Sequence, residues 1–300
     1  MKSLFHISLL ALLLAACSPH ARHDSHRPTV AVSIEPQHYL LQRIVGDSIR
    51  IVTMLPPDAD PENYEPSIRL LKELNNSRLY FSVGNMPFEE QLLSRSGIRD
   101  NGSVKVLSAA SLQNITDTHA HEHENHSPHH DGADPHIWTS PANCLIMAQQ
   151  MLSAVTQLDP HNTAYYTARF NLLKHELDSL NSLFASRLDP CAGDMIIVEH
   201  PSLSYFARDY GIAQLYFGAE NKEITPTRLR AVIDSARSLR RAVTMVSEAT
   251  YNAARTRAIA RQAGATSIEI NTLGSDFLQQ LSKLSIQLAD SHNAHSQSAR

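Results

Sequence analysis

The sequence predicts an α/β fold of two lobes, each a parallel β-sheet flanked by helices, linked by one long backbone helix. The first observation is that short β-branched runs alternate with amphipathic segments in both halves of the chain. This order is typical of parallel sheets covered by helices. The second is that residues 159–189 contain no glycine and no proline after Pro160, while apolar residues recur every three or four positions from Tyr166 to Leu188. That stripe predicts a single helix long enough to contact both lobes.

In the first half, β-branched and apolar runs predict strands over residues 29–34, 49–55, 79–83 and 105–107. Residues 39–45 are predicted to form a helix. A second helix is expected to begin at Pro66, because proline is favoured at the first helical position and an apolar face follows it.

Ser140-Pro141 combines a capping residue with proline and predicts a helix that ends near Gln157. Asp159-Pro160 repeats this signal at the start of the long helix. Beyond it, strands are predicted over residues 195–198, 212–217, 242–247 and 266–270, and helices over residues 202–210, 225–240, 253–263 and 277–289.

The N-terminus resembles a bacterial lipoprotein signal. Lys2 precedes an apolar stretch from Leu4 to Ala16, too short to span a bilayer, which ends in Leu-Ala-Ala directly before Cys17. We therefore expect lipidation of Cys17 and a lipid-anchored protein of the cell envelope on the periplasmic or extracytoplasmic face. The predicted organisation is a signal peptide over 1–17, a polar tether over 18–28, an N-terminal lobe over 29–158 with a His-rich loop at 119–133, the long helix over 159–189 and a C-terminal lobe over 190–293.

Composition excludes several classes of function. A formal net charge of −4 and 6% aromatic residues do not suit a nucleic-acid-binding surface. The chain contains no Gly-rich phosphate loop, GxSxG or HExxH motif. Cys144 and Cys191 match no metal-binding spacing and could be free or joined in a disulfide.

Three proline-stiffened turns offer candidate metal ligands at predicted strand ends, where parallel sheets bind ligands. They are residues 60–67 (DPENYEPS), 134–138 (DPHIW) and 199–201 (EHP). Before the second turn lies a tract with six clustered histidines: His119, His121, His123, His126, His129 and His130. This tract could be an auxiliary collector of weakly bound metal or simply a polar insert.

Taken in order, these segments resemble the zinc-uptake solute-binding proteins of ABC importers, over about Val30 to His292. Residues 58–66 (DADPENYEP) stand where the family has Gly-Ala-Asp-Pro-His-x-Tyr-Glu-Pro. Residues 134–138 match its Asp-Pro-His-x-Trp motif. Residues 200–211 match a segment that begins His-Pro and ends Tyr-Gly.

The resemblance implies that His136 and His200 are imidazole ligands, and that Glu62 replaces the family's first histidine. Carboxylate oxygen and imidazole nitrogen bind zinc at similar distances, so Glu62 remains a plausible ligand. Asn271 lies near the position of a family aspartate and is predicted as the fourth ligand, with water, Glu248 and Asp276 as alternatives.

The resemblance implies capture of Zn(II) between two lobes and delivery to a membrane permease by a monomer that is not an enzyme. A manganese or iron receptor of the same family is the main alternative. A zinc-dependent hydrolase is the other, but its ligands would come from distant parts of the chain without a helix that presents a general base.

Overall fold

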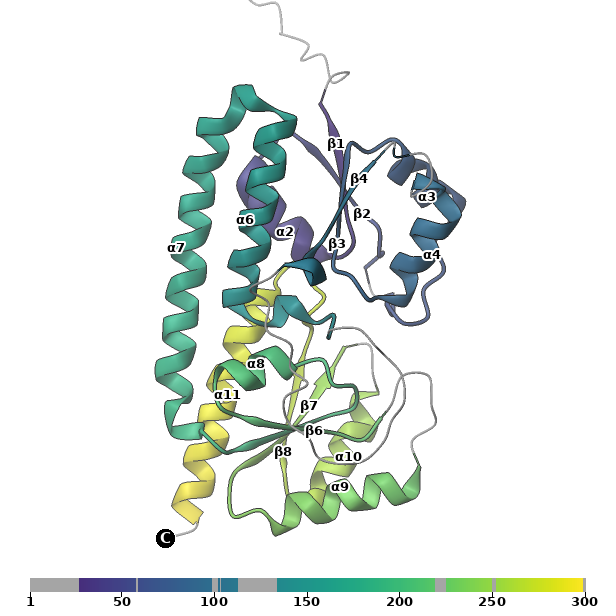
Figure 1. Ribbon diagram of the computed structural model, residues 1–300. Helices are drawn as coiled ribbons and strands as arrows, with labels where there is room; N and C mark the ends of the chain where they lie inside the picture. Colours follow the sequence, from purple (N-terminus) through teal and green to yellow (C-terminus); the bar gives the residue numbers. More distant parts are fainter. Residues whose placement is uncertain are drawn as a thin grey trace, which may run out of the picture.

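The computed structural model describes residues 27–57, 59–98, 102, 104–112, 134–218, 225–249 and 252–298. It confirms the predicted fold class of two parallel-sheet lobes flanked by helices and connected by a long helix (Figure 1). The predicted signal peptide with Cys17, most of the tether and the six clustered histidines lie outside the described residues. Among the helices that are described, none is both long enough and apolar enough for a membrane span.

The N-terminal lobe contains four parallel strands in the order β2-β1-β3-β4. They are β1 (Thr29–Val32), β2 (Arg50–Thr53), β3 (Leu79–Ser82) and β4 (Lys105–Ser108). The helices of this lobe are α2 (Glu35–Val45), α3 (Ile68–Asn75), α4 (Pro87–Ser96) and α6 (Pro141–Leu158). The chain places β2 on one side of β1 and β3 on the other. The strand order therefore reverses between β1 and β3, and ligands bind at the carboxyl ends of the strands at such a switch point.

The C-terminal lobe repeats this strand arrangement as β6-β5-β7-β8, again all parallel. Its strands are β5 (Met195–Val198), β6 (Ala213–Tyr216), β7 (Val243–Glu248) and β8 (Thr266–Ile270). Its helices are α8 (Ser204–Asp209), α9 (Pro226–Ser238), α10 (Ala253–Ala263) and α11 (Phe277–Ser298). The two lobes therefore share one topology.

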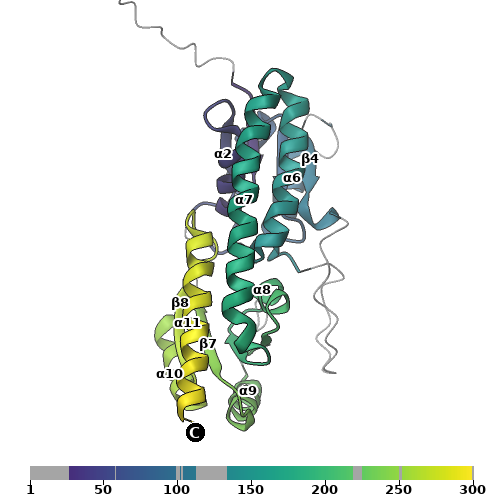
Figure 2. The same cartoon turned by 90° about the vertical axis from the view of Figure 1, so that its left-hand side faces the viewer.

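Helix α7 (Thr163–Leu188) runs along both lobes, as the two views in Figures 1 and 2 agree. Its 26 residues span roughly 39 Å. One stripe is buried against α2, α6 and α11 and consists of Tyr166, Phe170, Leu173, Leu177, Phe184 and Leu188. The helix is shorter than the predicted 159–189, because Pro160–Asn162 and Asp189–Cys191 each form a separate 3₁₀ turn.

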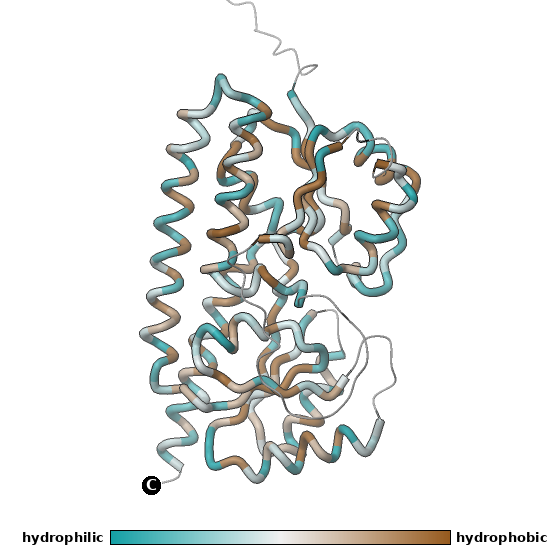
Figure 3. The backbone as a smooth tube through the Cα atoms, in the orientation of Figure 1, coloured by the Kyte–Doolittle hydropathy of each residue, from teal (hydrophilic) through white to brown (hydrophobic). Residues whose placement is uncertain are grey.

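The larger of two hydrophobic clusters extends through the contact between the lobes. Figure 3 shows apolar residues concentrated on the strands of both sheets. Tyr39 of α2 meets Phe277 of α11 edge to face, with ring centroids 5.7 Å apart. A second, smaller cluster packs α9 and α10 onto the sheet of the C-terminal lobe. Because the lobes share buried apolar surface, moving them apart would expose that surface to water, and the free-energy cost limits their relative motion.

Several helix boundaries differ from the predictions. Helix α2 begins at Glu35 because Pro36 occupies its first turn, and α3 begins at Ile68 because Ser67, rather than Pro66, precedes and caps it. Helix α4 was not predicted, although Pro87 and two acidic residues in its first turn are typical of a helix start. Helix α11 continues to Ser298, beyond the predicted end at residue 289.

Both cysteines within the described residues are buried and free, so Cys144 and Cys191 form no disulfide. The Cys144 thiol instead donates a hydrogen bond to the Trp138 carbonyl at 3.2 Å.

Candidate metal centre

The carboxyl ends of the strands in the two lobes face each other across a small cavity. It has a volume of about 40 Å³ and is lined by the side chains of both lobes. Pockets for organic ligands usually measure about 300 Å³ or more, so this space suits an ion and its ligands. Its polar lining residues are Asp60, Glu62, Asn85 and His136 from the N-terminal lobe, and His200, Glu248 and Thr272 from the C-terminal lobe.

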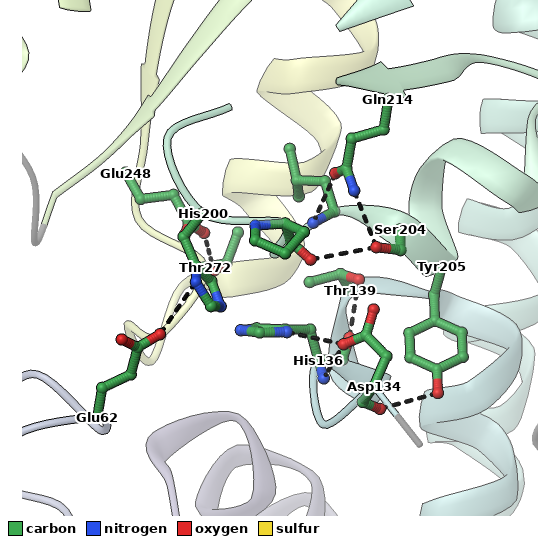
Figure 4. A network of polar contacts seen from close by, with 12 residues as sticks. Glu62, Asp134, His136, Thr139, His200, Ser204, Tyr205, Gln214, Glu248 and Thr272 are labelled. Carbon is green, nitrogen blue, oxygen red and sulfur yellow. Dashed lines mark hydrogen bonds and ion pairs between the residues drawn. The ribbon is translucent and has the colours of Figure 1, made fainter. Parts of the chain in front are cut away.

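His136 is held by the aspartate two residues before it. Asp134 Oδ1 accepts hydrogen bonds from the His136 backbone N–H at 2.9 Å and from its Nδ1 at 2.8 Å (Figure 4). This contact assigns the proton to Nδ1 and leaves the lone pair on Nε2, the arrangement used by metal-ligating histidines. Tyr205 of the C-terminal lobe donates to the Asp134 carbonyl at 2.9 Å, so both lobes secure the turn.

The Asp134 carboxyl is almost fully buried, and this burial by itself raises its pKa. The electrostatic interaction with His136 and the hydrogen bonds from His136 and the Ser204 hydroxyl outweigh burial, so the pKa of Asp134 lies below its usual value. Asp134 is therefore ionised at neutral pH. It can orient the imidazole and stabilise positive charge in the cavity.

His200 lies two residues beyond β5 and reaches the cavity from the opposite lobe. Its ring centroid is 4.9 Å from that of His136, and the two ring planes meet at 60°. Both side chains are about nine-tenths buried. Two imidazoles brought this close from separate lobes can both contact one small ion.

Glu62 connects the lobes through a charged contact. Its Oε1 lies 3.0 Å from His200 Nδ1, and its backbone N–H donates to Asp60 Oδ1 at 3.0 Å within the Asp60-Pro61 turn. The ligand atoms of Glu62, His136 and His200 are not all within 4.8 Å of one another.

Beside the histidines, an inter-lobe network gives Trp138 and Thr272 contacts that the sequence did not predict. Trp138 Nε1 donates to the Thr272 carbonyl at 2.9 Å, and the Thr272 hydroxyl donates to Glu248 Oε1 at 2.5 Å. The Trp138 ring also lies beside the His136 imidazole, with centroids 5.3 Å apart. The sequence feature that could have indicated this role for Trp138 is its position two residues after His136 in the DPHIW turn.

The structure does not bring Asn271 to the cavity. Its Oδ1 accepts from the Leu273 backbone N–H at 3.1 Å, and the residue is absent from the lining. Asp276, directly before α11, accepts from the Gln280 side chain at 2.7 Å. Of the protein residues considered for the fourth position, Glu248 alone lines the cavity.

The chain as a whole is similar to known metal-binding proteins. The family model described as "Zinc-uptake complex component A periplasmic" matches residues 30–289. A putative metal-binding protein of Chlamydia trachomatis is 26% identical over 73% of this chain and 75% of its own. The iron-binding protein YfeA of Yersinia pestis is 27% identical over 75% of this chain and 71% of its own. A zinc-bound structure of a ZnuA deletion mutant superposes with a TM-score of 0.77 at 29% identity and covers 89% of this chain and 98% of that one.

Proposed function

Because the chain belongs to the periplasmic zinc-uptake component A family, we propose that it captures Zn²⁺ between its two lobes and passes it to a membrane permease. It is a solute-binding component of a metal ABC transporter and not an enzyme. The observation that carries the proposal is the approach of His136 and His200 from opposite lobes to a ring separation of 4.9 Å.

In the proposed site the ion is bound by His136, His200 and the Glu62 carboxylate. Two imidazoles and one carboxylate suit zinc in tetrahedral coordination. Glu248 lines the same cavity and is a better candidate than Asn271 for the fourth position. Oxygen ligands also favour manganese and iron, and one relative is named as an iron-binding protein, so these ions are the alternative cargo.

Capture and release follow from the division of the ligands between lobes. When zinc replaces the proton between Glu62 and His200, the carboxylate moves toward His136 and the cavity closes around the ion. The shared core and α7 keep this movement small. A permease that binds the separated form of the lobes more tightly would lower the metal affinity and release the ion.

The proposed setting is the cell envelope, where a lipid on Cys17 would hold the monomer near its permease. The histidines at 119–130 would raise the local zinc concentration by weak binding, because imidazoles in a polar tract lack the fixed geometry of His136 and His200.

The proposal is tested by zinc titration of the full chain against a competing chelator. His136→Ala and His200→Ala are each expected to weaken the tight site by more than about 100-fold, since each removes a ligand. Deletion of residues 119–130 should keep the tight site and remove only weakly bound ions. His175→Ala, an exposed histidine of α7, is the matched control and should bind as the parent does.

Loss of tight binding on deletion of residues 119–130, with both single-histidine variants unchanged, would refute the assignment. The same titration with Mn²⁺ and Fe²⁺ identifies the cargo. Tighter binding of either ion than of Zn²⁺ would replace zinc in the proposal.

A further inference from the structure

A second group of metal-ligating side chains lies at the other edge of the C-terminal lobe. Cys191 ends the 3₁₀ turn after α7, Asp194 directly precedes β5, and His292 projects from α11. Because Asp194 stands at the start of β5 and His200 follows its end, the strand separates this group from the cavity between the lobes. Within the described part of the chain, this is the group of His, Cys, Asp or Glu side chains whose ligand atoms all lie within 4.8 Å of one another.

The polar contacts of this group leave one buried oxygen without a partner. His292 Nδ1 contacts Asp194 Oδ2 at 2.7 Å, but Asp194 Oδ1 has no hydrogen-bond partner among the described residues. The aspartate is only 5% exposed. A buried carboxylate oxygen without a partner is costly, and a cation bound beside it would remove that cost.

The donor types indicate which cation fits. A thiolate, a carboxylate and an imidazole are all common zinc ligands, whereas calcium and magnesium select oxygen ligands. Ligand atoms around tetrahedral zinc lie roughly 3.3–3.7 Å apart, given bond lengths of about 2.0–2.3 Å. Side-chain rotations would bring the three residues from their present separations to these values.

The group is buried on one side and reachable on the other. Cys191 is 1% exposed, whereas the His292 side chain is 18% exposed. Burial, together with the Asp194 charge, raises the pKa of the Cys191 thiol to about 11. The metal-free thiol is therefore neutral, and zinc binding would displace its proton.

We propose that Cys191, Asp194 and His292 form a second, structural zinc site, with water in the fourth position. The bound ion fastens the C-terminal helix α11 to the turn that follows the long helix α7. Its role is to hold the C-terminal lobe together, separately from the capture of transported metal between the lobes.

Cobalt titration of the full chain tests this site, because a cobalt–thiolate bond produces an intense near-ultraviolet charge-transfer band. The proposed ligands of the inter-lobe site and of residues 119–130 are nitrogen and oxygen atoms and give no such band. All samples carry Cys17→Ser, which removes the N-terminal thiol, and are kept reduced. The parent chain is expected to show the band, and Zn²⁺ should abolish it by displacing Co²⁺.

The variants separate this site from the proposed transport site. Cys191→Ser should eliminate the band and reduce the bound zinc by one ion, and His292→Asn should weaken this cobalt site at least tenfold. Cys144→Ser, the matched buried cysteine, and the double variant His136→Ala/His200→Ala should both keep the band. Circular dichroism checks that each variant is folded. Absence of the band from the parent chain, or its persistence in Cys191→Ser, would overturn the proposal.

Discussion

Replacement of Trp138 by phenylalanine tests whether the network between the lobes supports the metal centre. The change keeps an aromatic ring beside His136 but removes the Nε1–H that donates to the Thr272 carbonyl at 2.9 Å. Trp138 is 1% exposed, so water does not readily replace the lost bond. The variant therefore leaves a carbonyl oxygen without its donor at the junction of the lobes.

The expected cost follows from these contacts. A buried acceptor without a partner costs about 1–3 kcal/mol. The apolar ring atoms that phenylalanine lacks contribute roughly 1–2 kcal/mol more. We expect the free energy of unfolding of the metal-free protein to fall by about 2–5 kcal/mol, and zinc affinity to fall roughly tenfold, as for other residues that support a metal ligand.

Urea denaturation followed by circular dichroism measures the stability, and chelator competition measures the affinity. Tyr165→Phe is the aromatic control, because Tyr165 lies on the exposed side of α7 and its change should stay within about 0.5 kcal/mol. A Trp138→Phe variant that matches the parent in both stability and affinity would show that the network does not support the site.

Three further predictions concern charge and protonation. Asp134→Asn should weaken zinc binding roughly 10–100-fold with little loss of fold, because a neutral amide can orient His136 but adds no negative charge near the bound ion. Chelator competition measures this, with the exposed Asp178→Asn as control. Glu89→Gln should destabilise the fold by about 1–3 kcal/mol in urea denaturation, since its two oxygens accept from Val83 N–H at 2.7 Å and Gly84 N–H at 2.8 Å and a carboxamide can accept only one. Burial raises the pKa of Glu89 above its usual 4.5. The parent protein therefore loses stability as the pH rises from 4.5 to the pKa of Glu89 in the folded state, and its free energy of unfolding should approach that of Glu89→Gln. A difference between the two proteins that stays constant with pH would contradict this. Zinc affinity should fall as the pH drops from about 8 to about 5, because protonated imidazole cannot bind metal. A flat affinity over this interval in chelator competition would count against histidine ligands.

Local sequence patterns were sufficient to predict the two α/β lobes and the long helix. A strand or helix is recognised from the spacing of apolar residues and from its capping residues, and both signals lie within a few positions of each other. The DPENYEPS and EHP turns likewise follow strands β2 and β5, whereas the DPHIW turn precedes α6. The assignment of Glu62, His136 and His200 as metal ligands remains a prediction, now supported by their approach to one cavity.

Other features depended on contacts between residues far apart in the sequence. The bond from Trp138 to Thr272 joins positions 134 residues apart, and His292 reaches Asp194 across 98 residues. Asn271 was expected at the metal centre by its place after the last strand, but the turn directs its oxygen to the Leu273 backbone. Neither Cys191 nor His292 belongs to a local metal-binding motif. The order of strands in each sheet and the packing of α11 against the end of α7 determine which side chains meet, and no local periodicity encodes those distances.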